Sequence, residues 1–263
     1  TITSGPALLA LIGLLITGVL LGLRVKGALF IAILLTTLIG IPMQITSVPS
    51  NFFTLPAMPY FFDFEWSQIF TWDMLIVVLT FLFVDIFDTV GTLVGVSTKA
   101  GMLTADGKVP HAKRALLSDA IATAVGAILG TSTVTTYVES AAGVAEGGRT
   151  GLTSLFTAIF FGLSLLLSPL FIMIPSAATA PALILVGLFM ASPIKEINFD
   201  DFTESIPAFI TFLMMPLTYS ISEGIMFGII SYVLMKLFTL RIKDLSPVTV
   251  ILSILFVLKF IYG

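Results

Sequence analysis

The sequence places two carboxylates three residues apart in the middle of a long apolar segment. Asp85 and Asp88 lie midway along residues 74–97, and their spacing sets them on one face of a helix, which Thr92 continues. Charged side chains at the centre of a membrane helix are costly and usually functional. Two carboxylates this close in a low dielectric resist double ionisation, so we expect one of them to carry a proton. The alternative is an aspartate that only hydrogen-bonds neighbouring backbone.

A third carboxylate, Glu139, stands where one kind of local sequence changes to another. Residues 131–138 are rich in β-branched side chains and predict a short strand, whereas residues 139–145 are small and predict a half-helix. Non-helical backbone at membrane depth persists only when it is buried in protein or lines a cavity, and a half-helix points its positive dipole end at the occupant. We therefore expect Glu139 to bind a ligand, with Ser140 beside it. The alternative is a carboxyl group that merely satisfies the broken backbone.

The remaining polar residues are assigned supporting roles. Asp119 is expected to be a polar anchor near the end of its apolar segment. Glu146, Glu223, His111 and the charged residues of 195–204 are interpreted as solvated loop residues. Five hydroxyl residues are expected to support the strand backbone rather than to touch a ligand: Thr131, Ser132, Thr133, Thr135 and Thr136.

The composition restricts the class of protein. The 263 residues are 57% hydrophobic and only 10% charged, with a mean hydropathy of +1.13, which indicates a polytopic all-α membrane protein. The absence of cysteine excludes disulfides and thiolate metal sites, and a single histidine argues against a histidine-rich metal centre. The net charge of −3 is too small to imply a nucleic-acid partner. We recognise no cofactor motif.

The chain divides into apolar segments long enough to require a bilayer. At about 20 residues a crossing there is room for about nine or ten segments. The chain begins without methionine and enters an apolar segment at once, so we expect it to be the later part of a longer protein. The predicted segments are 6–23, 27–42, 74–97, 115–130, the broken 131–146, 151–174, 178–193, 205–219, 221–240 and 247–262.

Basic residues predict the orientation of these segments in the cell membrane. When each segment, including the broken one, is counted as one crossing, the lysine- and arginine-bearing loops after residues 23, 97, 146, 193 and 240 all fall on one side. The positive-inside rule makes that side the cytoplasm. Only Lys259 lies outside the pattern. Residues 46–72 are proline-rich and aromatic without any lysine or arginine, and they predict a loop at the opposite interface.

A faint internal repeat accompanies this alternation. Pro6-Ala7 precedes an apolar run that ends near Gly27, and Pro207-Ala208 precedes a similar run that ends near Gly224. The orientation count starts the first copy outside and the second inside, as an inverted repeat requires.

Three stretches resemble the purine permeases of the nucleobase–cation symporter superfamily, which includes the xanthine/uracil permeases. The similarity is greatest to the AzgA-like branch, which transports adenine, guanine and hypoxanthine, and it covers nearly the whole chain. The stretches are residues 83–95 (FVDIFDTVGTLVG), 131–143 (TSTVTTYVESAAG) and 145–153 (AEGGRTGLT).

The resemblance implies a fold, a site and a mechanism. It implies two inverted seven-helix repeats with core and gate domains, of which the first repeat is largely missing here. Gate segments would occupy 1–45 and 176–263, a non-cytoplasmic loop 46–72, and core segments 73–175. Substrate binding would involve Asp88, Glu139, Ser140, Asp85 and Thr92, and Asp88, Asp85 and Glu139 would couple transport to protons. Related folds also imply a homodimer through the gate domain, and Na⁺ is the alternative coupling ion.

Two other functions compete with a proton-coupled nucleobase transporter. An anion transporter of the same architecture would need a cation beside the broken segment, but the nearest, Arg149, lies about ten residues beyond Glu139. An intramembrane aspartyl protease needs two aspartates on different helices, whereas Asp85 and Asp88 share one predicted helix.

Overall fold

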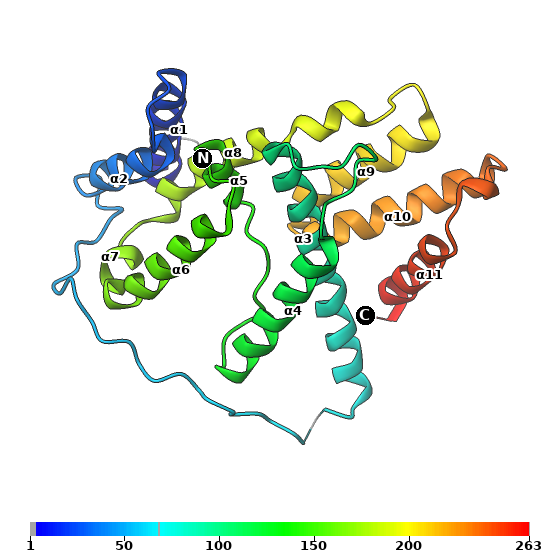
Figure 1. Ribbon diagram of the computed structural model, residues 1–263, viewed down its shortest axis with the longest axis horizontal. Coiled ribbons are helices and arrows are strands. Elements are labelled where there is room, and N and C mark those ends of the chain that lie inside the picture. Colours follow the sequence, from blue (N-terminus) through cyan, green and yellow to red (C-terminus); the bar gives the residue numbers. More distant parts are fainter. Residues whose placement is uncertain (1–3, 68, 263) are drawn as a thin grey trace. The chain divides into compact units, whose positions relative to one another are not determined.

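The computed structural model describes residues 4–67 and 69–262, and every regular element among them is a helix (Figure 1). This confirms the all-α class that the composition predicted. The α-helices are α1 (Gly5–Gly22), α2 (Ala28–Gly40), α3 (Trp72–Ala100), α4 (Ala112–Ile128), α5 (Ser140–Ala145), α6 (Gly151–Leu166), α7 (Ser168–Ile172), α8 (Ser176–Met190), α9 (Phe202–Thr218), α10 (Ile221–Phe238) and α11 (Pro247–Tyr262). Two short 3₁₀ turns, η1 (Ser192–Glu196) and η2 (Ile242–Asp244), complete them.

The ends of these helices follow from local sequence chemistry. Gly27 precedes α2 with a φ of 71°, a conformation that glycine adopts without strain. The Asp201 carboxylate accepts the Thr203 backbone N–H at the start of α9, and the Ser220 hydroxyl does the same for Glu223 at the start of α10. One predicted segment, 151–174, is divided into α6 and α7, because Pro169 stands in the first turn of α7 and cannot continue the preceding hydrogen-bond ladder.

By length and composition, four helices of the described chain are long and apolar enough to cross a membrane: Gly5–Gly22, Trp72–Ala100, Ser176–Lys195 and Ile221–Phe238. The apolar helices Ala28–Gly40, Gly151–Leu166, Phe202–Thr218 and Pro247–Ile261 are shorter. The broader prediction of a polytopic membrane protein therefore agrees with the helices observed.

The chain folds as two compact units, each built from segments that are distant in sequence. The first unit comprises Thr1–Pro59, Val94–Pro110 and Tyr137–Ser192, and the second comprises Tyr60–Leu93, His111–Thr136 and Pro193–Gly263. Helix α3 contributes residues to both units.

In the first unit, α1, α2 and α8 pack together through small side chains. A methyl group at Gly13 of α1 would lie 2.9 Å from a Thr36 carbon of α2 and 3.0 Å from Pro181 of α8, so this glycine permits the close approach of all three helices. Leu9, Ala28 and Ala178 are among the most buried residues of this contact.

In the second unit, α9 and α10 form a tight antiparallel hairpin and α11 packs on α10. A methyl group at Gly228 of α10 would overlap the hydroxyl of Thr211 of α9, which again marks close helix packing. Phe256 of α11 is buried and makes edge contacts with Phe83 and Phe87 of α3. These contacts hold the middle of α3, which carries the two aspartates.

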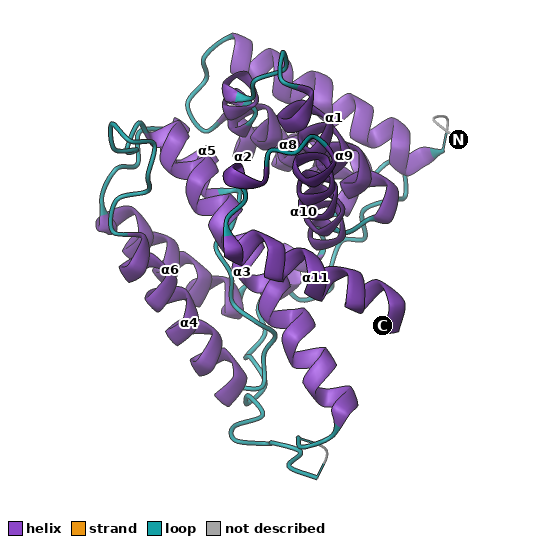
Figure 2. Ribbon diagram, turned by 90° about the vertical axis from the view of Figure 1, so that its right-hand side faces the viewer, coloured by secondary structure: helices purple, strands orange, loops and turns teal. Residues whose placement is uncertain are grey.

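The strand predicted for residues 131–138 is wrong. The structure has no strand in the described part of the chain, and residues 131–137 form an irregular connection between α4 and α5 (Figure 2). Its β-branched side chains favour extended backbone, but a strand also needs a hydrogen-bonded neighbour. The half-helix predicted after it is confirmed as α5.

Candidate functional site

The two aspartates of α3 lie far from either end of that helix. Asp88 is twelve residues from Ala100, which corresponds to about 18 Å along the helix. Asp85 and Asp88 are both half-buried, and Thr92, one turn further on, is buried at 3% exposure. The predicted placement of these three residues on one helical face is therefore consistent with α3.

Both aspartates accept hydrogen bonds from the irregular connection that follows α4. The Thr133 hydroxyl donates to Asp85 Oδ1 at 2.9 Å, and the Thr135 hydroxyl donates to Asp88 Oδ2 at 3.1 Å. Thr133 and Thr135 were expected to support the strand backbone, but their hydroxyls instead bind the carboxylates. The alternation of two residues places both threonines on the same side of the connection.

The connection is positioned by a side chain of α4 instead of a neighbouring strand. The Thr123 hydroxyl donates to the Val134 carbonyl at 2.7 Å and accepts the Val134 backbone N–H at 3.3 Å. One side chain thus satisfies both polar groups of a backbone unit that has no sheet partner. Gly126 of α4 helps, because a methyl group there would come within 3.0 Å of Thr131 and 3.2 Å of Val134.

Asp119 joins this group, which the sequence analysis did not predict. It lies seven residues into α4, in the middle of the helix and not at its end. Its Oδ2 accepts the hydroxyl of Thr89, a residue of α3 that is only 1% exposed. Asp119 is also a carboxylate within an apolar segment, so the criterion that selected Asp88 should have selected it as well. We call Asp85, Asp88, Asp119, Thr89, Thr133 and Thr135 the carboxylate–hydroxyl cluster.

Glu139 and Ser140 belong to the first unit. Glu139 is the residue before α5, with helical backbone angles, and both side chains are exposed. Helix α5 has only six residues, and Ala141 is its buried member. The backbone break expected at Glu139 is present, with a turn in place of the strand end.

The two charged residues that follow α5 are engaged in its packing. The Glu146 carboxylate accepts the backbone N–H of Gly27 at 2.9 Å, and the residue is exposed just after α5, as expected for a solvated loop residue. Arg149 donates to the Val144 carbonyl at 3.1 Å, where a cation satisfies the carbonyl end of a helix. Arg149 therefore serves the opposite end of α5 from Glu139, which does not favour an anion site at Glu139.

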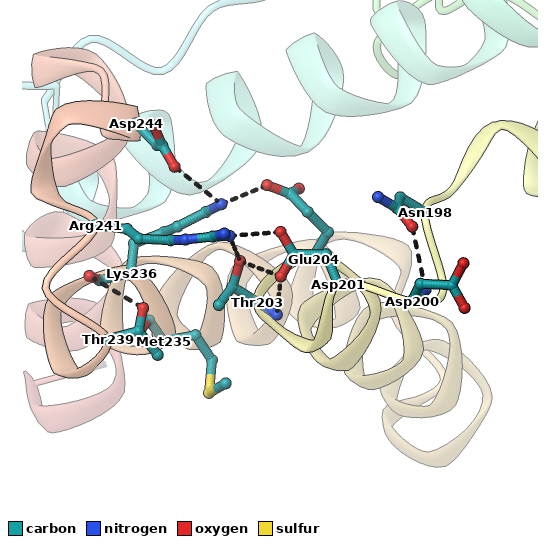
Figure 3. Close-up of polar contacts among 10 residues, drawn as sticks. All are labelled: Asn198, Asp200, Asp201, Thr203, Glu204, Met235, Lys236, Thr239, Arg241 and Asp244. Atoms are coloured by element: carbon teal, nitrogen blue, oxygen red, sulfur yellow. Dashed lines mark hydrogen bonds and ion pairs between the residues drawn. The ribbon is translucent and has the colours of Figure 1, made fainter.

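A second group of charges lies at the ends of α9 and α10 (Figure 3). Lys236 is 2% exposed, and its ammonium lies 2.6 Å from Glu204 Oε1 and 3.5 Å from Asp244 Oδ2. Arg241 pairs with Asp201, whose pKa falls to about 2 because Thr203 and Arg241 donate hydrogen bonds to it. The interpretation of 195–204 as solvated loop is thus wrong for Asp201 and Glu204. We call the five charged residues the ion-pair cluster: Asp201, Glu204, Lys236, Arg241 and Asp244.

The two clusters differ in what their carboxylates can do. In the described chain, no group of three or more histidine, cysteine, aspartate or glutamate side chains is arranged to hold a metal ion. Asp85 and Asp88 are bonded to neutral hydroxyls, so each can still accept a hydrogen bond from a ligand N–H or bind a proton. The carboxylates of the ion-pair cluster are instead paired with Lys236 or Arg241.

Comparison with known proteins identifies related sequences. The model of the Permease family matches residues 3–227. The guanine/hypoxanthine permease PbuG of Bacillus subtilis is 44% identical over 265 residues, which cover 99% of this chain and 60% of that protein. The adenine permease AdeP of Escherichia coli is 41% identical over 267 residues, which cover 99% of this chain and 59% of that protein.

A protein of Methanocaldococcus jannaschii that is named only as a permease is 46% identical over 257 residues, covering 97% of this chain and 59% of its own. The chain thus spans about 60% of the length of the curated relatives it matches. The resemblance inferred from the three sequence stretches is confirmed. This chain belongs to the xanthine/uracil permease family.

Proposed function

We propose that the protein containing this chain transports purine nucleobases across the cell membrane by proton symport. The observation that carries the proposal is the pair Asp85 and Asp88 at mid-helix, bonded by threonine hydroxyls and included in none of the ion pairs of the described residues. The names of PbuG and AdeP, which are purine permeases, support the same substrate class. The alternative of an anion transporter is not favoured, since Arg149 is bonded at the far end of α5.

Carboxylates select the part of a purine that they bind. A carboxylate accepts hydrogen bonds only, so the ligand must supply donors. Hypoxanthine, guanine and adenine offer ring N–H groups, and guanine and adenine add an exocyclic amine. Asp88 and Glu139 are proposed to accept these donors, and Ser140, Asp85 and Thr92 are proposed as further substrate-binding residues. A protonated carboxyl avoids the cost of a buried charge, so substrate binding and proton uptake would be linked.

The remaining features are proposed from the sequence and the family. Core segments (73–175) would rock against gate segments (1–45 and 176–263), with the basic loops in the cytoplasm, and the protein would form a homodimer. Proton is proposed as the coupling ion, with Na⁺ as the alternative.

Uptake by the full-length protein in proteoliposomes tests the proposal. Labelled hypoxanthine, guanine and adenine should accumulate under an imposed proton gradient, and labelled sulfate should not. Unlabelled uric acid, whose added carbonyls would face carboxylate oxygens, should compete much less well than hypoxanthine. Accumulation of sulfate without purine uptake would establish the anion transporter instead, and equal competition by uric acid would refute the hydrogen-bond logic.

A further inference from the structure

Four side chains of the carboxylate–hydroxyl cluster form a continuous row from α3 to α4. Thr135 Oγ1 lies 3.1 Å from Asp88 Oδ2, Thr89 Oγ1 lies 3.1 Å from Thr135 Oγ1, and Asp119 Oδ2 lies 3.1 Å from Thr89 Oγ1. The row thus has a carboxyl group at each end and two hydroxyls between them. Thr89, inside the row, is 1% exposed, so its hydroxyl does not exchange hydrogen bonds with bulk water.

The number of hydrogens in this row does not match the number of contacts. Each hydroxyl has one hydrogen, so two hydrogens are available when Asp88 and Asp119 are both ionised. If Thr135 donates to Asp88 and Thr89 donates to Asp119, no hydrogen remains for the contact between the two threonines, and two sets of lone pairs face each other. Three contacts need three hydrogens. One additional proton, on either carboxyl, completes the row.

The charges around the row also favour holding that proton. Asp85 and Asp88 of α3 are the charged groups that act on Asp119 across the helix contact, and both are acidic. Residues 129–136, which pack between the helices, contain no titratable side chain. The basic residues of α4, Lys113 and Arg114, lie in its first turn, more than one turn before Asp119. None of the three ion pairs among the described residues includes Asp119.

We propose that Asp88 and Asp119 share one proton through Thr135 and Thr89. During transport, Asp119 receives this proton from Asp88. The step balances without any other reactant. The O–H bond at Asp88 Oδ2 breaks as its proton passes to Thr135, the Thr135 proton passes to Thr89, and the Thr89 proton passes to Asp119 Oδ2. The row ends with every contact still hydrogen-bonded in the reverse direction, so no side chain has to leave its place.

The direction of the proton transfer follows from the distance of each aspartate from the loop 101–111. The loop 101–111 joins α3 to α4, so the last residue of α3 and the first residue of α4 are at the same side. Along the helices Asp88 is about 18 Å from that side and Asp119 about 10 Å. The row thus leads from the proposed binding residue toward the loop that the basic residues predict to be cytoplasmic. This role rests on the proposed function, but the shared proton does not.

Infrared spectroscopy of the full-length protein tests the shared proton without a transport assay. The wild type at neutral pH should show a carboxylic acid carbonyl band from the pair, which shifts in D₂O. An asparagine amide at either end would donate the third hydrogen and leave the other carboxyl ionised. Asp88→Asn and Asp119→Asn should therefore each abolish the same band, whereas Asp73→Asn, at the exposed start of α3, should retain it. A band that survives either substitution overturns the proposal.

A matched pair of threonine variants tests the transfer. Thr89→Val interrupts the row but leaves both carboxyls, so we expect proton-driven purine accumulation to fall about tenfold while exchange of labelled for unlabelled purine continues. Thr98→Val removes a hydroxyl of the same helix that, among the described residues, bonds only the Val94 carbonyl, and this variant should accumulate purine as the wild type does. Equal accumulation by both variants would overturn the transfer. A wild type that transports no purine would refute the proposed function and leave the infrared result to decide the shared proton.

Discussion

The carboxylate–hydroxyl cluster and the ion-pair cluster each contain three carboxylates, yet only those of the ion-pair cluster have cations as partners. Asp85, Asp88 and Asp119 accept hydrogen bonds from threonine hydroxyls. The other three, Asp201, Glu204 and Asp244, are paired with Arg241 or Lys236. A carboxylate whose charge is balanced by a fixed cation has little reason to bind a proton or a ligand donor. One that has only neutral partners retains that capacity.

We expect the two clusters to divide stability and chemistry between them. The ion-pair cluster joins the ends of α9 and α10 and closes the start of α9 through the bond from Thr203 to Asp201. The carboxylate–hydroxyl cluster links α3 to α4, and it does so with groups that can exchange protons. Substitutions in the first cluster should therefore change stability, and substitutions in the second should change transport.

The largest effect is expected at Asp88. Asp88→Asn should abolish proton-driven accumulation of purine in proteoliposomes, with the protein still inserted and folded, because asparagine cannot carry the proton. Any residual exchange of labelled for unlabelled purine should be independent of pH between about pH 5.5 and 8. Asp85→Asn, which removes a like charge, should instead shift the pH profile toward acid. The comparison would break if Asp88→Asn still concentrated purine, or if Asp244→Asn in the ion-pair cluster abolished accumulation.

The next effect is expected at Glu139. Glu139→Gln should weaken purine binding about tenfold or more, which corresponds to about 1.4 kcal/mol, since a charge-assisted hydrogen bond is replaced by a neutral one. Equilibrium binding of labelled hypoxanthine to the full-length protein measures this. Glu146→Gln offers a matched control on the other side of α5, and its amide oxygen can still accept the Gly27 N–H. Equal losses in the two variants would remove Glu139 from the site.

A smaller effect, on stability, is expected at Lys236. Lys236→Met should lower the free energy of unfolding by about 1 kcal/mol, because Glu204 and Asp244 lose a buried partner but remain partly exposed to water. Lys243→Met, at an exposed lysine of the neighbouring 3₁₀ turn, should have less effect. Unfolding followed by tryptophan fluorescence in mixed micelles gives both values. If the two substitutions were equally damaging, burial of the pair would not be the cause.

The smallest effect is a predicted constancy with pH at Asp201. Its pKa falls from 3.8 to about 2 on folding, so its stabilising contribution is fully present above the unfolded value and is lost only as the pH drops toward 2. The difference in melting temperature between Asp201→Asn and wild type should therefore be the same at about pH 5.5 and about pH 8, the range in which transport is expected to change. A difference that varied across this range would show that the ion-pair cluster also titrates there.

The helices were predictable because each apolar run has one physical solution in a membrane. Nine of the ten predicted segments contain helices near the expected bounds, with 151–174 divided at Pro169, whereas 131–146 contains only the six-residue α5. The partners of polar groups were not predictable in the same way. Asp201 and Arg241 are 40 residues apart, and no local pattern links them. Residues 131–137 do not form a strand, because their backbone has no strand beside it among the described residues. A side chain of α4, Thr123, bonds the backbone of Val134 instead.

The sequence predicted the kind of residue in the candidate site, but it did not predict all of the residues. Asp85, Asp88 and Glu139 were predicted as site residues because a carboxylate in an apolar segment is energetically costly and is usually functional. Asp119 met the same criterion, but the predicted segment began at residue 115 while α4 begins at Ala112, and this error made Asp119 look like a helix-end anchor. Thr89 has no distinguishing pattern in the sequence. It becomes notable only when its hydroxyl is found between Thr135 and Asp119.

The shortness of α5 gives it a mechanical property. Six residues extend about 9 Å, which is too short a helix to bend appreciably. Glu139 lies directly before this rigid helix and Glu146 directly after it. The far end rests on the first residue before α2, where Glu146 holds the Gly27 amide. A movement of α5 as one body would therefore either carry the start of α2 with it or break the hydrogen bond between Gly27 and Glu146.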